Sequence, residues 1–348
     1  MGYGPKMWLG CCGLYLQPSE PLKLLLVAYL AGYLADRFPY LALSTSIKFR
    51  EILGLLAPTL MMTGLAMALL VIQRDLGTAS LFFMLFASIV YVASGRSSLL
   101  FISAVLVIAA GVAGYSLFDV VKLRVDAWIN PWLDPSGGSF QIIQSLMALA
   151  NGGLVGRGPG LGSPTLVPLA HSDMIFSAIA EEYGLTGVIA LLLLFGILAY
   201  RGLRAGLLAA DAYRSYLAVG LTTYLVGQAL VIMAGGLRLL PLTGITLPFV
   251  AYGGSSLVTS FIALLLLLHI SASSQKMDTM SETRAGSLPG AGQVKSFSIL
   301  GLLFFLGIFL AAVTSGWWAI IRSPEILSRT DNPRRAITDR WVLRGEIY

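Results

Sequence analysis

The chain has 348 residues, of which 57% are hydrophobic and only 11% charged, and its formal net charge is +6. A soluble domain normally carries about a quarter charged residues, so this composition excludes an ordinary soluble enzyme. The mean hydropathy of +0.81 predicts an all-α polytopic membrane protein, because helices satisfy their own backbone hydrogen bonds in lipid. The positive charge fits attraction to anionic membrane lipid or phosphate, and nothing in the pattern indicates nucleic acid.

The sequence predicts eight spans, each near the length of about 20 residues that a bilayer requires. Basic residues gather in the short connections 36–50, 95–98 and 201–215, which marks these connections as cytoplasmic. The long loop 119–172 and the C-terminal tail are therefore expected outside the cytoplasm. The predicted spans are residues 21–35, 53–72, 77–93, 99–118, 174–200, 216–235, 247–270 and 297–320.

The composition changes at residues 271–296, which are rich in Ser, Thr, Gly and Pro. Such a segment predicts a flexible cytoplasmic linker. It would separate a body of about seven spans, residues 1–270, from the single span 297–320 and an extracytoplasmic tail at 321–348. The two cysteines, Cys11 and Cys12, are adjacent and show no metal-ligand spacing.

The long outer loop contains two patterned stretches. The sequence QIIQSLMALANGG, from Gln141 to Gly153, places its apolar residues on one helical face, which predicts a helix that lies along the membrane interface or re-enters the protein. The sequence GRGPGLGS follows, with alternating glycines from Gly156 to Gly162. Glycines expose backbone amides, so this stretch is either a phosphate cradle or a plain flexible turn.

Ionisable residues gather where the outer loop meets the fifth span, in PLAHSDMIFSAIAEEYG. Asp173 is either a helix N-cap or a functional carboxylate. Glu181 and Glu182 lie deeper, where a charge costs about 3 kcal/mol, so each needs a basic partner or a wet cavity. At 100° per residue, Glu181 is offset from Asp173 by about 80° and Glu182 by about 180°. Glu181 is therefore expected on the side of Asp173.

Other charges lie near the ends of the first three predicted spans. Glu20 and Lys23 begin the first span, and Arg74 and Asp75 form the corner between the second and third. Charged groups on several segments near the same membrane face predict one polar cavity.

Five stretches occur in order along the chain, namely LQPSEPLKLLLVAYLAGYLADR, QRDLGTASLFF, FQIIQSLMALANGGLVGRGPGLG, PLAHSDMIFSAIAEEYGLTG and LPLTGITLPFVAYGGSSL. They resemble the successive signatures of the SEDS proteins, RodA and FtsW. The resemblance implies a SEDS-type helical bundle and a peptidoglycan glycosyltransferase that polymerises lipid II at the outer face of the bacterial cytoplasmic (inner) membrane.

The resemblance also implies the site residues. The essential carboxylate of the family falls on Asp173, which would act as general base towards a sugar hydroxyl. The Pro-Ser-Glu-x-x-x-Lys motif falls on Glu20 and Lys23. The Gln-Pro-Asp-Leu-Gly motif reaches Asp75, with Arg74 in place of its proline.

The leaving group of this reaction, a lipid-linked diphosphate, requires positive charge. The available cations are Lys23, Arg74, Arg157 and Arg238, with Mg²⁺ or another divalent cation as a further candidate. We expect His171 and Glu181 to complete the substrate-binding set, whose ligands would be lipid II and undecaprenyl-linked glycan.

Both ends of the chain depart from the family pattern. The resemblance begins before the fourth family helix, so counterparts of the first three helices are lacking. Residues 297–320 and the tail sequence NPRRAITDRWVLRGEIY resemble the membrane anchor and pedestal start of a class B penicillin-binding protein. These features predict a fusion of a polymerase with its transpeptidase partner. A flippase or transporter of the lipid-linked precursor, and a non-catalytic scaffold of the elongation or division machinery, are the alternatives.

Small residues recur along the last predicted span. Gly301, Ala312, Ser315 and Gly316 fall broadly on one side of a helix. Because lipid gives no hydrophobic drive between helices, their association depends on close packing. This stripe is therefore predicted to contact the body.

Overall fold

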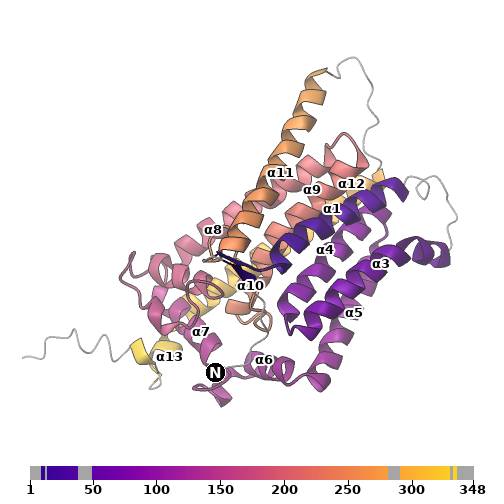
Figure 1. Ribbon diagram of the computed structural model, residues 1–348. Coiled ribbons are helices and arrows are strands. Elements are labelled where there is room, and N and C mark those ends of the chain that lie inside the picture. The colour runs from indigo at the N-terminus through magenta and orange to yellow at the C-terminus, as the bar shows by residue number, and fades with distance from the viewer. Residues whose placement is uncertain (1–8, 12–13, 38–48, 281–290, 330–331, 335–348) are drawn as a thin grey trace, which may run out of the picture. The chain divides into compact units, whose positions relative to one another are not determined.

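The computed structural model describes residues 9–11, 14–37, 49–280, 291–329 and 332–334 (Figure 1). Two short antiparallel strands, β1 (Leu9–Cys11) and β2 (Leu14–Leu16), precede a helical chain. Short 3₁₀ turns lie at Pro131–Leu133 and Pro164–Leu166, and π turns at Thr223–Gly227 (η3) and Trp317–Ile321 (η5). The α-helices are α1 (Ser19–Arg37), α3 (Phe49–Ile72), α4 (Leu76–Ser94), α5 (Ser97–Leu117), α6 (Asp119–Ile129), α7 (Phe140–Gly152), α8 (Ile175–Leu207), α9 (Ala212–Thr222), α10 (Gln228–Gly236), α11 (Gly254–Met280), α12 (Ala291–Gly316) and α13 (Ser323–Leu327).

Within the described part of the chain, seven helical segments are long and apolar enough to cross a membrane. They match seven of the eight predicted spans and confirm an all-α, multi-pass membrane protein. The first predicted span, 21–35, forms α1 but is outside this set, because α1 carries Glu20, Lys23, Asp36 and Arg37. The seven segments are Gly54–Ile72, Leu76–Ser94, Ser97–Leu117, Ile175–Leu207, Ala212–Gly236, Gly254–Ser273 and Gln293–Ile321.

The predicted linker 271–296 is largely helical where the structure describes it. Helix α11 continues to Met280, and α12 begins at Ala291. Residues 281–290 lie outside the described residues. The stretch from 271 to 280 contains neither Gly nor Pro, the two residues that most disfavour a helix interior, so nothing there ends α11.

The chain forms two compact units. The first unit comprises residues 1–114, 195–230 and 243–307, and the second comprises 115–194, 231–242 and 308–348.

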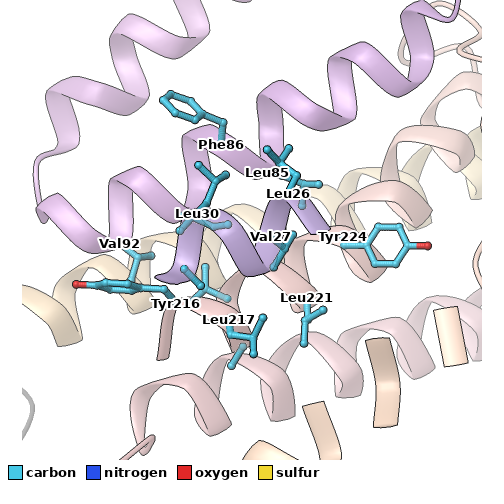
Figure 2. Close-up of a cluster of buried hydrophobic side chains, with 14 of the residues drawn as sticks. Leu26, Val27, Leu30, Leu85, Phe86, Val92, Tyr216, Leu217, Leu221 and Tyr224 are labelled. Carbon is cyan, nitrogen blue, oxygen red and sulfur yellow. The ribbon is translucent and has the colours of Figure 1, made fainter. Parts of the chain in front are cut away.

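The core of the first unit lies where α1, α4 and α9 pack side by side (Figure 1). Leucines and aromatic residues from the three helices fill it (Figure 2). Gly220 brings α9 close to α1, because an added Cβ there would lie 2.4 Å from Val27 Cγ1. Helix α3 packs against α4, and α11 packs against α1 and α9. Close approach at small residues is typical of helices that associate in lipid.

Helix α12 has a contacting face that overlaps in part with the predicted stripe. Phe297, Leu300 and Phe304 are buried in the core of the first unit. Farther along, Ala311 and Ser315 are buried, whereas the predicted Ala312 and Gly316 are partly exposed. The contacting face therefore includes the predicted Ser315, and it also uses large apolar side chains that the prediction left out.

Helix α7 is enclosed in the second unit. Residues on all of its sides are buried, including the polar Gln144 and Ser145. Ser145 Oγ shares a hydrogen bond of 2.6 Å with Ser177 Oγ and donates to the Gly236 carbonyl at 2.8 Å. The segments η5 and α13 also pack against α7. Of the two predictions for this helix, re-entry into the protein is therefore the one that its burial supports.

Four backbone hydrogen bonds join the glycine-rich loop to α8 around Gly184. Gly184 interrupts the helix with φ 64° and ψ −161°, a conformation that is essentially limited to glycine. Four amides donate across the interruption at 2.9 to 3.1 Å, namely Leu185 to Gly153, Thr186 to Leu154, Arg157 to Glu181 and Gly158 to Glu182. The amides of Arg157 and Gly158 are thus used to close the loop, which favours the structural turn over the phosphate cradle.

Replacing Gly184 with alanine should destabilise the protein by about 3 kcal/mol or more, since it combines backbone strain with a steric clash. The new Cβ would lie 2.3 Å from the Gly156 amide nitrogen. Chemical unfolding in detergent measures the loss. Gly111→Ala on α5 is the control, because its Cβ would meet nothing within 4 Å and alanine favours a helix by up to about 1 kcal/mol. Equal unfolding midpoints for the two variants would show that the close backbone contact at Gly184 does not stabilise the protein.

Candidate functional site

Asp173 lies just before the first turn of α8. Leu169 has a left-handed backbone conformation, with φ 54°. Its carbonyl oxygen accepts hydrogen bonds from the backbone amides of Ser172 and Met174 at 3.0 and 3.1 Å, which forms a turn before the helix. The first helical bonds, from Ser177 and Ala178, end on the Met174 carbonyl, which is the position of an N-cap residue. Met174 therefore occupies the N-cap position, one residue after Asp173, and the N-cap prediction for Asp173 is wrong.

The surroundings of Asp173 make its carboxylate a stronger base. Burial raises the pKa of Asp173 above its usual range, while a hydrogen bond from Ser172 and the charges of Arg124 and His171 act in the opposite direction. Burial is the largest of these effects, because a charged form is disfavoured where water is excluded. A carboxylate whose pKa is closer to neutral is better matched to proton abstraction.

A pocket of about 600 Å³ lies beside this segment. Its size falls within the range of ligand sites, about 300 to 1,000 Å³. Apolar residues form most of its wall, and His171, Glu182 and Tyr183 add polar groups. The lining residues are Pro164, Thr165, Val167, Pro168, Leu169, Ala170, His171, Ile175, Ala178, Ile179, Glu182 and Tyr183.

Glu181 is fully buried and paired with a residue of the C-terminal tail. Arg334 binds its carboxylate with two nitrogens, Nε to Oε1 at 2.8 Å and Nη2 to Oε2 at 3.0 Å. Asn151 Nδ2 also donates to Oε1 at 2.8 Å, and Arg334 Nη1 donates to Gln144 Oε1 at 2.9 Å. Of the two alternatives for Glu181, pairing with a basic group is the one observed. Glu182 instead lies at the pocket.

Two of the four predicted cations, Arg157 and Arg238, belong to the second unit, and their surroundings differ from each other. Arg157 is exposed, and its Nε and Nη2 donate to Asn151 Oδ1 at 3.0 and 2.6 Å. Arg238 donates to the carbonyls of Trp128 and Ile129 at 2.8 and 2.6 Å, so it caps the C-terminal end of α6. Arg157 is therefore better placed to meet an anionic ligand.

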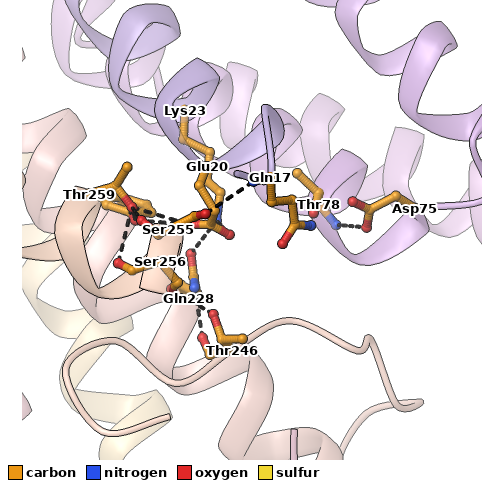
Figure 3. A network of polar contacts seen from close by, with 11 residues as sticks. Gln17, Glu20, Lys23, Asp75, Thr78, Gln228, Thr246, Ser255, Ser256 and Thr259 are labelled. Atoms are coloured by element: carbon orange, nitrogen blue, oxygen red, sulfur yellow. Dashed lines mark hydrogen bonds and ion pairs between the residues drawn. The ribbon is translucent and has the colours of Figure 1, made fainter. Parts of the chain in front are cut away.

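A buried polar network surrounds Lys23 in the first unit (Figure 3). The Lys23 side chain is fully buried, and its Nζ donates to Glu20 Oε1 at 2.8 Å and to Gln228 Oε1 at 2.9 Å. Tyr224 and Thr259 hydroxyls lie 3.4 and 3.3 Å from Glu20 Oε2. Gln228 was not among the predicted site residues, although a glutamine inside an apolar span is a visible signal.

The corner between α3 and α4 has a structural explanation. Asp75 caps α4, since its Oδ1 accepts from the Thr78 amide at 3.1 Å, and it also interacts electrostatically with Lys23. Arg74 is exposed with φ 62°. Gly77 fits closely against Thr243, whose carbonyl oxygen would lie 2.3 Å from an added Cβ.

The predicted site residues thus form a set in each unit. The first unit brings Glu20, Lys23 and Asp75 together, and a single shared cavity stays a prediction. Within the described residues, no group of three or more His, Cys, Asp or Glu side chains could hold a metal ion.

The sequence model of the FtsW, RodA and SpoVE cell cycle proteins matches residues 2–276 of this chain. The chain belongs to the FtsW/RodA/SpoVE family. This family is the SEDS group that the five sequence motifs indicate, and the resemblance is confirmed. Residues 277–348, which include α12 and the tail, lie outside the match.

A comparison with a named relative supports the same family assignment. The chain is 38% identical over 275 residues to the peptidoglycan glycosyltransferase RodA of Mycobacterium tuberculosis strain H37Rv. The match covers 77% of this chain and 58% of that relative, so the chain spans little more than half of the relative's length.

Two solved structures share the fold. A chain of a peptidoglycan synthase complex, studied for its coordination of polymerization and crosslinking, is 27% identical with a TM-score of 0.62. That match covers 79% of this chain and 75% of the other. An aspartate-to-alanine mutant of RodA from Thermus thermophilus is 26% identical with a TM-score of 0.52, and the match covers 77% and 71% of the two chains. The helical SEDS fold is therefore confirmed.

Proposed function

We propose that this chain belongs to a peptidoglycan glycosyltransferase that polymerises lipid II at the outer face of the bacterial inner membrane. The observation that carries the proposal is the partly buried carboxylate of Asp173, which lies in the chain between His171 and Ile175, two residues that line a pocket of ligand size. The name of the Mycobacterium tuberculosis relative supports the same activity.

The reaction requires one proton acceptor and positive charge for the leaving group. The 4-hydroxyl oxygen of one sugar attacks the anomeric carbon of another, and the bond from that carbon to the lipid diphosphate breaks. Asp173 takes the hydroxyl proton as general base, and the diphosphate leaves with the bonding electrons. Arg157, which belongs to the same unit as Asp173, is exposed and suited to contact the diphosphate, while the exposed Arg74 of the first unit stays a candidate cation. Lys23 and Arg238 are held by other groups of the protein, which suits structural roles.

The same proposal gives α12 and the tail a partner role. We propose that residues 297–348 are the membrane anchor and pedestal start of a class B penicillin-binding protein fused to the polymerase. The solved peptidoglycan synthase complex supports such a pairing. This arrangement requires the tail to lie outside the cytoplasm. A cysteine introduced at Ser328, which is exposed, should therefore react with an impermeant thiol reagent in intact cells, and protection from the reagent would contradict this topology.

A flippase of the lipid-linked precursor is the second candidate. The buried pair of Lys23 and Glu20 favours it, because ionisable residues inside a membrane often line transport pathways. Labelled lipid II supplied to the wild type and to Asp173→Ala separates the candidates. Polymer from the wild type alone supports the enzyme, whereas translocation without polymer supports the flippase. If the wild type makes no polymer and translocates no lipid II but still binds a penicillin-binding protein, the result supports the scaffold.

The acid side of the pH profile should respond to Arg124. Asp173 acts only when ionised, so activity falls as the pH drops through its pKa. The positive charge of Arg124 lowers the pKa of Asp173, and its removal raises that pKa. Arg124→Gln should therefore move the acid limb of kcat/KM to higher pH. Arg322→Gln is the control, because Arg322 pairs with the half-exposed Glu325. An unmoved limb, or one that moves to lower pH, would show that Asp173 is not the base.

A further inference from the structure

Glu181 and Arg334 form a buried ion pair, in which the negative charge of the Glu181 carboxylate needs a positive partner. Its side chains are 0% and 4% exposed. Removing one member of a buried ion pair leaves an uncompensated charge, which is strongly destabilising. The structure meets this requirement with a residue that lies 153 positions farther along the chain.

A short relay leads from this pair to Arg157. Asn151 donates from Nδ2 to Glu181 Oε1, and its Oδ1 accepts from Arg157 Nε and Nη2. The backbone of Arg157 is also joined to Glu181, through its amide and the Glu181 carbonyl. One amide side chain therefore separates the exposed guanidinium of Arg157 from a buried carboxylate.

We infer that Arg334 is a positioning residue for Arg157. Arg334 neutralises Glu181, so the guanidinium of Arg157 stays turned outward, where it can bind the diphosphate of a lipid-linked substrate. Without Arg334, the buried carboxylate would attract the adjacent Arg157 guanidinium inward. This inference rests on the proposed function, and it explains why a cation near the surface is tied to a buried network.

The segment that carries Arg334 is docked at several points within the second unit. Trp318 Nε1 donates to the Leu237 carbonyl at 3.0 Å, and Ser323 Oγ donates to the Ala150 carbonyl at 2.9 Å. The Arg329 guanidinium lies 4.0 Å from the centre of the Trp132 ring. These contacts hold the tail where Arg334 reaches Glu181. The position of the tail and the availability of Arg157 are thus linked.

A rescue experiment distinguishes this role from simple support of the fold. Arg334→Gln should weaken binding of undecaprenyl diphosphate to the protein in nanodiscs about tenfold, the loss of roughly one charged contact. Arg334→Gln combined with Glu181→Gln should bind within about twofold of the wild type, because the competing carboxylate is gone. Arg322→Gln, a change of the same kind at a more exposed tail pair, should bind as the wild type does.

Two results would overturn the inference: wild-type affinity in Arg334→Gln, or equally weak binding in the single and double variants. Where Arg334→Gln does not fold, the double variant decides, and tenfold weaker binding by it contradicts the relay. Polymer formation is measured in parallel. A wild type that binds the diphosphate but makes no polymer from lipid II would contradict the proposed function, while the rescue would still support the role of Arg334.

Discussion

Replacing Asp173 with asparagine is expected to lower the rate of lipid II polymerisation about 10²- to 10⁴-fold, the usual contribution of a general base. Asparagine keeps the shape of the side chain but cannot accept the hydroxyl proton. Because burial disfavours the charged form of Asp173, the neutral amide should not destabilise the protein. The rate of glycan formation from labelled lipid II in nanodiscs measures the effect, and an unfolding curve checks that the fold is intact.

The matched control for this change is Asp119→Asn. Asp119 is an exposed aspartate in the first turn of α6, also in the second unit. Its replacement should leave the polymerisation rate within about twofold of the wild type, since surface changes are nearly neutral. Similar losses in both variants would mean that negative charge in this region matters in general, and that Asp173 is not a specific base.

The second large effect is expected at Glu181. Glu181→Gln removes the carboxylate that two nitrogens of the buried Arg334 bind, which should lower the free energy of unfolding by about 3 to 5 kcal/mol. Glu182→Gln changes a partly exposed residue at the pocket and should stay within about 0.5 kcal/mol. Chemical unfolding of both variants in the same detergent makes the comparison.

The explanation is checked by removing both charges of the pair. Arg334→Gln in the Glu181→Gln background should recover part of the lost stability, because neutral partners replace an uncompensated ion. If Glu182→Gln were as destabilising as Glu181→Gln, the buried pair would not be the cause. No recovery in the double variant would lead to the same conclusion.

Sequence reasoning succeeded where the signal is local. Hydropathy identified seven spans, because the cost of a polar group in lipid depends on each segment by itself. Helix α8 is regular from Ile175 up to the interruption at Gly184. The angular prediction for the two glutamates was nevertheless wrong about the pocket, because Glu182 lines it while Glu181 is buried and paired with Arg334.

The partners of the buried charged residues could not be predicted, because they are distant in the sequence. The pattern showed that Glu181 needs a basic partner, but Arg334 lies 153 residues away and Gln228 lies 205 residues from Lys23. Such pairings follow from packing, and no local periodicity reports them. The N-cap prediction for Asp173 failed for a smaller reason, because the turn at Leu169 moves the helix start to Ile175.

The π turn η3, Thr223–Gly227, lies between α9 and α10. A π turn corresponds to one extra residue in a helix, and one residue adds about 100° of rotation. The segment therefore changes its angular phase partway through the membrane: Val219 and Leu221 before the turn are core residues, whereas Gln228 after it meets Lys23. Because Ala229, Ile232 and Met233 after the turn are buried as well, the extra residue lets one continuous span stay packed on both sides of the turn while Gln228 reaches Lys23.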